Sequence, residues 1–301
     1  QCATCTIGST GSIALTAGLN GSVNVNGAGI TSTGGTVTLT AGTNDGNVAV
    51  SAGAPVSGSG AVSLITGAAG SITVGAAVSS TGSTLTLTGG SGAAESVTIN
   101  TGVTATGNTG VVVTTPTLNL NGTAALTATS NNVAIQSNGA ANALTVTMGS
   151  GSTINAAAAG ADVTFNNTTA GAITINNAGL GTINANDTVV LNGGANAVSA
   201  NVNNINGCVT GSGTTFAVAV DTGNLTIGNV STTGLTTFTN TDAAVALGNI
   251  SQCATCTIGS TGSIALTAGL NGSVNVNGAG ISSSGGAVTL TAGTNDGNVA
   301  V

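Results

Sequence analysis

Chemistry in this 301-residue sequence would depend on five cysteines and seven acidic residues, because the chain contains no Lys, Arg, His or Tyr. General acid–base catalysis most often uses His, and a nucleophilic Ser or Cys needs a base beside it. Two carboxylates suffice for a glycosidase, but the acids are scattered, with no Asp-x-Asp or Glu-x-Asp pair. We therefore expect no enzymatic activity, no catalytic residue, no metal site and no cofactor. The acids are Asp45, Glu95, Asp162, Asp187, Asp221, Asp242 and Asp296.

The cysteines form two Cys-x-x-Cys pairs and one isolated residue. The pairs are Cys2/Cys5 and Cys253/Cys256, and the isolated residue is Cys208. Such a pair can be a redox motif, half of a zinc site or a structural disulfide. A thioredoxin-like motif needs a βαβ setting, which this sequence lacks. Zinc needs four ligands, and two pairs so far apart in the sequence could supply them only between chains.

Disulfides suit an exported protein best. We expect all five cysteines to serve as disulfide or inter-chain cross-link residues, either within each pair or between neighbouring molecules. An odd number of cysteines favours at least one intermolecular bond or free thiol. The alternative is that they are small buried core residues.

The last fifty residues of the chain repeat the first fifty. Residues 1–50 recur as residues 252–301 with three substitutions, which gives a period of 251 residues. Long-period duplication over a short-period pattern is typical of solenoids and fibres. We expect residues 1–301 to form one continuous β-solenoid, part of a longer tandem array, with no separate second domain.

Short segments in which aliphatic and small polar residues alternate recur along the chain. This period-2 pattern predicts β-strands with one aliphatic side. Turn residues such as Gly34-Gly35 and Asp45-Gly46 separate the segments. The segments are 12–16, 22–26, 36–40, 47–50, 71–74, 84–88, 96–100, 144–147, 172–176 and 224–227.

A parallel β-helix fits this pattern better than an antiparallel sandwich or barrel. Sandwiches and barrels usually carry large aromatic cores and charged outer faces, whereas this chain has three Phe, no Trp and 2% charged residues. Similar phrases recur at 35–42, 60–67 and 83–89. The fold class we predict is therefore all-β, a solenoid with coils of roughly 20–25 residues, about eleven per period, and a period of about 50 Å.

Stacked coils would place matching residues above one another. With coils of about 23 residues the period is close to a whole number of turns, so we expect successive periods to present Cys-x-x-Cys on the same side. Cys208 precedes Cys253 by 45 residues, about two coils, so a direct bond between them needs a locally short separation. We also expect corner ladders of asparagine. The candidates are Asn24, Asn26, Asn176, Asn177, Asn203 and Asn204.

The composition restricts the partners of the chain. Ordinary domains are about one quarter charged, so a chain with 2% charged residues must cover its surface with Ser, Thr, Asn, Gly and Ala. Such a surface lacks the charge that keeps neighbours apart, and we expect lateral and end-to-end packing of copies of the chain. Without Lys or Arg, binding to nucleic acid or to anionic membranes has no electrostatic basis. No apolar run approaches the ~20 residues of a membrane-spanning helix.

The phrases GSIALTAG at 11–18, GTVTLTAG at 35–42 and GAVSLITGAAGSITVGAAVSSTG at 60–82 resemble the repeats of filamentous-haemagglutinin-like bacterial surface proteins, which are exported by two-partner or autotransporter routes. The likeness is good over residues 8–100 and loose elsewhere. It implies a right-handed parallel β-helix, extracellular display, and adhesive or structural work. Those adhesins usually contain Lys and Arg, so their absence here favours a packed assembly over a free-standing arm.

Three functions remain open on the sequence. The preferred one is a non-enzymatic structural protein, a segment of a giant repetitive chain that forms an extracellular sheath, tube or fibre. The second is the stalk of a bacterial surface adhesin. The third is ice binding, because Thr-x-Thr segments resemble the flat threonine faces of β-helical antifreeze proteins. These segments are Thr38/Thr40, Thr84/Thr86/Thr88 and Thr145/Thr147.

Overall fold

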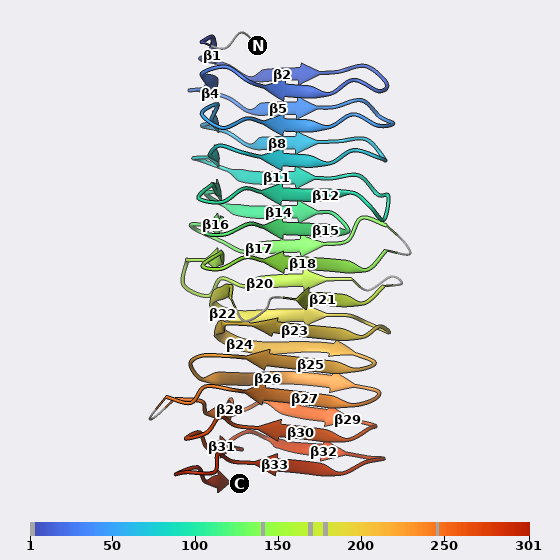
Figure 1. Cartoon of the computed structure of the whole chain (residues 1–301), viewed down its shortest axis with the longest axis vertical. Helices are drawn as coiled ribbons and strands as arrows, with labels where there is room; N and C mark the ends of the chain where they lie inside the picture. Colours follow the sequence, from blue (N-terminus) through green and yellow to red (C-terminus); the bar gives the residue numbers. More distant parts are fainter. Residues whose placement is uncertain (1–3, 140–141, 168–170, 177–179, 245–246) are drawn as a thin grey trace.

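The computed structural model describes residues 4–139, 142–167, 171–176, 180–244 and 247–301, and this part of the chain is all-β. Its 34 strands pair in parallel, and the chain winds as coils of three strands that stack in one column (Figure 1). The fold is a parallel β-solenoid, as the sequence predicts. Each coil has three faces, which we number in the order in which the chain meets them.

The first face holds β1 (Thr6–Ser9), β4 (Gly29–Ser32), β7 (Val56–Gly58), β10 (Val78–Ser80), β13 (Thr104–Gly107), β16 (Ala125–Ala128), β19 (Thr153–Ala156), β28 (Ile250–Gln252), β31 (Val274–Asn275) and β34 (Val299–Ala300). The second face holds β2 (Ile13–Thr16), β5 (Val37–Thr40), β8 (Val62–Ile65), β11 (Thr84–Thr88), β14 (Gly110–Thr114), β17 (Val133–Gln136), β20 (Val163–Asn166), β29 (Thr257–Ser260) and β32 (Gly280–Ser283).

Three long strands turn the corner from the first face to the second: β22 (Thr182–Asn192), β24 (Asn204–Gly213) and β26 (Leu225–Thr232). The third face forms a separate 12-stranded sheet. It holds β3 (Val23–Val25), β6 (Val48–Val50), β9 (Ile72–Val74), β12 (Ser96–Ile99), β15 (Thr117–Leu120), β18 (Leu144–Met148), β21 (Ile173–Asn176), β23 (Val198–Val202), β25 (Phe216–Val220), β27 (Thr236–Asn240), β30 (Ile264–Thr267) and β33 (Val288–Thr291).

The core is a set of aliphatic rows that run along the column. On the third face Val48 pairs with Val23 on one side and Ile72 on the other, and Val97 continues the row. Their inward side chains are buried while the residues between them face outward. Burying an aliphatic side chain of this size contributes about 1.5–3 kcal/mol, so each coil is stabilised chiefly by contact with the coils above and below it.

The ten predicted segments are all strands, with ends within two residues of the prediction except at β26, which extends to Thr232. The predicted coil length is correct on average, but the number of residues per coil varies widely. Val189 pairs with Val209, 20 residues later, whereas Val133 pairs with Val163, 30 residues later. The register also shifts between β22, β24 and β26. Irregular coils therefore lie in the asparagine-rich second half of the chain.

Each 251-residue period advances the chain by ten coils and one face. Ile258 is the copy of Ile7, and a whole number of turns would place both residues in one row. Ile258 instead lies ten coils along the row that begins with Leu15, on the second face. Likewise Leu266, the copy of Leu15, lies in the third-face row of Phe238. The expectation that successive periods present the same side is therefore wrong, because the average coil holds about 24 residues rather than 23.

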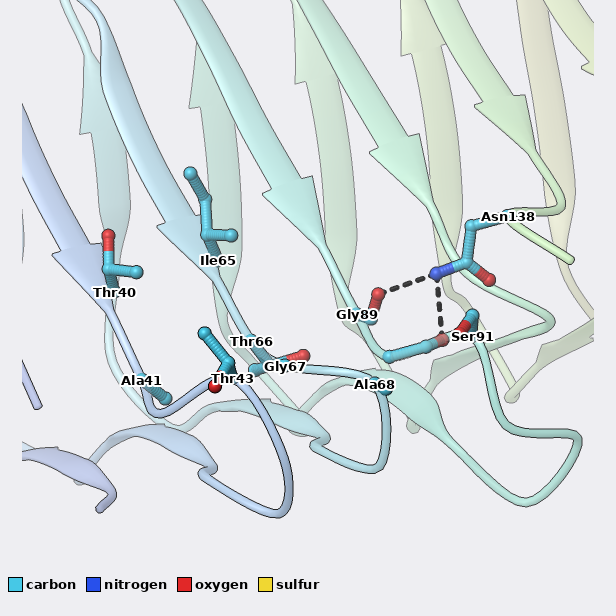
Figure 2. A pocket seen from close by; sticks show the side chains of 11 residues that line it. Thr40, Ala41, Thr43, Ile65, Thr66, Gly67, Ala68, Gly89, Ser91 and Asn138 are labelled. Carbon is cyan, nitrogen blue, oxygen red and sulfur yellow. Dashed lines mark hydrogen bonds between the residues drawn. The ribbon is translucent and has the colours of Figure 1, made fainter. Parts of the chain in front are cut away.

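A neutral groove hollows the corner between the second and third faces (Figure 2). Residues after β17 reach back over this corner, where Asn138 Nδ2 donates to the carbonyls of Gly89 at 2.6 Å and Gly90 at 2.7 Å. The lining contains no acid, base or thiol, so its Thr and Ser hydroxyl groups have no titratable side chain beside them in the groove. It is lined by Thr40, Ala41, Thr43, Ile65, Thr66, Gly67, Ala68, Gly89, Gly90, Ser91 and Asn138.

Candidate functional site: a cysteine cluster where the second copy begins

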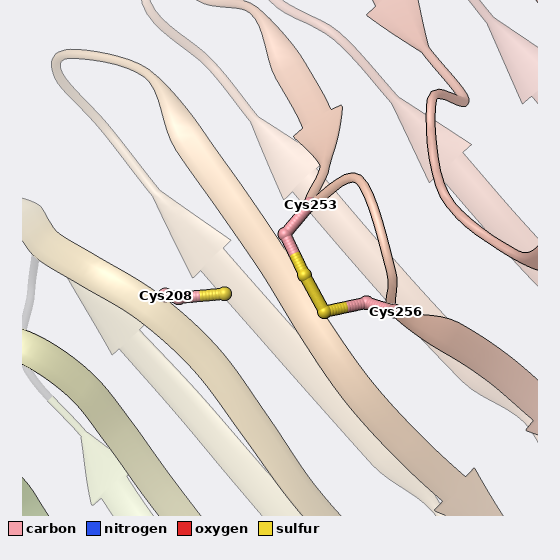
Figure 3. Close-up of side chains that lie close together, drawn as sticks. All are labelled: Cys208, Cys253 and Cys256. Atoms are coloured by element: carbon pink, nitrogen blue, oxygen red, sulfur yellow. A yellow bond between two sulfur atoms is a disulfide. The ribbon is translucent and has the colours of Figure 1, made fainter.

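Three cysteines meet at the corner between the first and second faces. Cys208 lies in β24, and the loop from Cys253 to Cys256 joins β28 to β29 (Figure 3). Their Sγ atoms all lie within 4.8 Å of one another. Cys253 and Cys256 form a disulfide, and Cys208 is a free, partly exposed thiol. Cys208 and Cys253 are therefore close in space, although they lie about two coils apart in the sequence.

The Cys253–Cys256 loop is a fixed corner of the solenoid. The Cys253 amide donates to the Ile227 carbonyl at 2.9 Å, and the Cys256 amide donates to the Cys253 carbonyl at 3.1 Å. The buried side chain of Gln252 donates from Nε2 to the Cys256 carbonyl at 2.7 Å and to the Gly280 carbonyl at 3.0 Å. These bonds satisfy backbone groups that a turn would otherwise leave unpaired. The disulfide thus sits on a rigid support.

A glycine in the coil between them lets Cys208 approach the disulfide. Cys208 and Cys253 lie two coils apart, a distance of about 10 Å for regular stacking. β26 passes between them, and its register slips by one residue just after Ile227. A Cβ on Gly228 would stand 2.9 Å from Cys208 Sγ, so the missing side chain leaves the space that the thiol occupies.

The environment disfavours the thiolate form of Cys208. Burial raises the pKa of this thiol above its ordinary value, and the negative charge of Asp187 on β22 raises the pKa further. Desolvation and a nearby like charge both penalise an anion. Cys208 is therefore held as a thiol near neutral pH, beside a disulfide with which its thiolate could react.

The structure brings together three of the five candidate cysteines. Cys5 is also disulfide-bonded, while Cys2, like Asn177 among the ladder candidates, lies outside the described residues. Among the residues that the structure describes, the cysteine cluster is the one group of three or more thiols or carboxylates close enough to hold one ion. Three sulfurs do not complete the four-ligand set of a structural zinc site.

The acids for which the structure gives contacts bind hydroxyl groups or backbone amides. Asp162 Oδ1 accepts from the Thr188 hydroxyl at 2.5 Å, and Glu95 Oε2 accepts from Ser71 Oγ at 3.1 Å. The buried Asp242 accepts from the amides of Gly223 at 2.6 Å and Ala244 at 2.8 Å. Each of these carboxylates accepts hydrogen bonds from neighbouring segments and so stabilises the local backbone.

One asparagine ladder in the structure runs through three residues that the sequence did not single out. Asn184 Nδ2 donates to Asn155 Oδ1 at 2.5 Å, and Asn206 Nδ2 donates to Asn184 Oδ1 at 2.6 Å. Of the predicted candidates, Asn26 instead accepts from Ser51 Oγ at 2.6 Å, and Asn204 donates to Asn206 at 3.3 Å. The sequence Ile-Asn-Ala occurs around both Asn155 and Asn184, and this repetition could have predicted that the two asparagines stack.

The Thr-x-Thr segments do not form one continuous threonine array. Thr38 pairs with Ser63 in the next coil, and Thr147 pairs with Asn119 and Asn176. On the third face the outward positions beside Thr98 are Thr73 and Asn119. The outer faces are therefore flat mixtures of small neutral residues.

Comparisons with protein families, with curated proteins and with solved structures found no match to this chain. The class that the geometry defines is a parallel β-solenoid. Among the described residues there is no helix of the length and apolarity needed to cross a membrane.

Proposed function

We propose that this chain is a non-enzymatic structural protein, a segment of a repetitive solenoid that builds an extracellular sheath, tube or fibre. Copies pack side by side through neutral faces, and coils stack end to end. The proposal rests chiefly on the repeated fifty residues, because their second copy continues the inward rows of the coils before it.

The last coil leaves core positions uncovered. Val37 and Val48 of the first copy are fully buried, because the next coil stacks on them. Their copies Val288 and Val299 are 42% and 46% exposed. In the first copy the coil that follows residue 50 supplies the cover, so a further period after residue 301 would bury these valines in the same way.

The sides of the column suit contact between copies. The chain carries a formal charge of −7 and no positive charge over 301 residues, and outward positions of the third face are Thr, Asn, Ser and Ala. Flat neutral surfaces pack without desolvating ions. Because each period turns by one face, Cys-x-x-Cys corners of an array would point in three directions, which supports contacts with several neighbours.

Electron microscopy and sedimentation of the purified chain test the proposal. We expect rods longer than one chain, and lateral bundles at higher concentration. Val299→Asp places a charge on the exposed end coil and should stop lengthwise growth. Thr98→Asp places a charge on the third face and should stop bundling, while Thr98→Ser should assemble like the unmodified chain. Dispersed monomers of the unmodified chain at all concentrations would overturn the proposal.

A further inference from the structure

We propose that Cys208 undergoes thiol–disulfide exchange with the Cys253–Cys256 disulfide. The exchange replaces a disulfide within one loop by a disulfide that links two coils. The proposal does not depend on assembly of the chain. It rests on three sulfurs within 4.8 Å of one another, one of them free, at a corner where Gly228 leaves the gap open.

The exchange balances without an external oxidant or reductant. Cys208 loses its proton to solvent, and its thiolate attacks Sγ of Cys256. A Cys208–Cys256 bond forms as the Cys253–Cys256 bond breaks, and the Cys253 sulfur leaves as a thiolate that takes up a proton. The chain has one disulfide and one free thiol at this corner both before and after the step.

Burial selects the sulfur that leaves. Cys256 is 7% exposed, whereas Cys253 is partly exposed and is followed by the exposed Ala254 and Thr255. A departing thiolate is better solvated at Cys253. The free thiol therefore moves from Cys208 to Cys253, which lies on the outer loop.

The new bond would join parts of the solenoid that the old bond does not. Cys253–Cys256 closes a sequence separation of 3, whereas Cys208–Cys256 would link β24 to the first corner of the second copy across β26. A disulfide that closes a longer loop restricts the unfolded chain more strongly. The exchange thus fastens the second copy to the coils that precede it.

The charged surroundings of Cys208 control the rate. Thiolate is the attacking species, and Asp187 on β22 is the only charged residue on the strands packed against β24, which are β22, β23, β25 and β26. The loop at Cys253 and the strand β28 carry no charge. Exchange should be slow near neutral pH and should accelerate as the pH rises toward the raised pKa of Cys208.

The test follows the free thiol through an alkaline incubation. The chain is quenched in acid, alkylated under denaturing conditions and cleaved before aspartate, since it has no trypsin site. Cys208 then lies in peptide 187–220, and Cys253 and Cys256 lie in peptide 242–295. We expect the two peptides to become disulfide-linked, with the alkylated cysteine changing from Cys208 to Cys253. The rate should not depend on protein concentration.

Two variants keep the test decisive. Gly228→Ala fills the gap beside the sulfur and should slow exchange at least about tenfold. Asp187→Asn lies on the surface, keeps the fold and should speed exchange several-fold at a fixed pH; here Cys208 is found in peptide 162–220. Alkylation that stays on Cys208 in both the unmodified chain and Asp187→Asn would overturn the proposal, as would linkage that rises in proportion to protein concentration.

Discussion

Phe216 and Phe238 pack against each other inside adjacent coils of the third face, with ring centroids 5.7 Å apart and ring planes inclined by 45°. Both side chains are fully buried. Phe238 also stacks between Val218 and Leu266 in its row, so its ring contacts the coil before it and the first third-face strand of the second copy.

Phe238→Ala should lower the free energy of unfolding by about 3–5 kcal/mol, because truncating a buried ring removes apolar contact and leaves a cavity. Urea unfolding followed by circular dichroism measures this loss. Phe238→Leu, which retains most of the volume, should cost less than about 1.5 kcal/mol. Equal losses for the two variants would show that the cavity is not the cause.

Gly18 and Gly269 have the same sequence context but different surroundings. A Cβ on Gly18 would meet no atom within 4 Å, whereas a Cβ on Gly269 would overlap the carbonyl oxygen of Asp242 in the preceding coil. Gly269→Ala should therefore destabilise the protein by about 1–3 kcal/mol. Gly18→Ala should be neutral or stabilise it by about 0.4–1 kcal/mol, since alanine restricts the unfolded chain.

Thermal unfolding of these two variants, at a concentration that keeps the chain monomeric, provides the comparison. Because residues 17–19 and 268–270 are identical, local propensity predicts equal effects. Only the stacking of a coil on Gly269 predicts different ones. Similar melting temperatures would therefore argue against the coil placement at the start of the second copy.

The alternating segments predicted many strands of the second and third faces, because each predicted strand there has two aliphatic residues at alternate positions. The first face was harder to predict. Strands such as β7 and β10 carry one large inward residue, Val56 or Val78, followed by small residues. A single valine followed by small residues gives no period-2 signal, and these strands become recognisable only when the neighbouring coils define the register.

The cysteine cluster was predictable only in part. The sequence identifies the cysteines and the distance of about two coils between Cys208 and Cys253, but not their contact. That contact depends on the register slip in β26 and on the missing side chain of Gly228. Both are properties of the coil between the cysteines. That coil contains no cysteine, so its sequence gives no sign of the contact.

The Cys208 thiol should titrate above its ordinary pKa, because burial and then Asp187 both disfavour the thiolate. A raised pKa in the folded state gives a stabilising contribution that is complete below the ordinary pKa of thiols and is lost as the pH rises through the folded pKa. Asp187→Asn should move the titration midpoint down toward the ordinary value. Thiolate absorbance, recorded immediately after each pH jump and before exchange, measures the midpoint. An unchanged midpoint would contradict the assigned role of Asp187.

A tandem array of this sequence should wind its repeated features around the column. Each period adds ten coils and one face, so a copy lies about 50 Å further along and one third of a turn around the axis. The inward rows enforce this geometry, because a slip of one residue would turn buried aliphatic side chains outward. Electron microscopy of a chain with four complete periods, labelled at an outer loop residue such as Thr255 and its copies, should show labels that return to the same face only after about 150 Å. Labels aligned on one face every 50 Å or so would contradict the row assignment of Ile258 and Leu266, and with it the three-directional contacts proposed for the assembled protein.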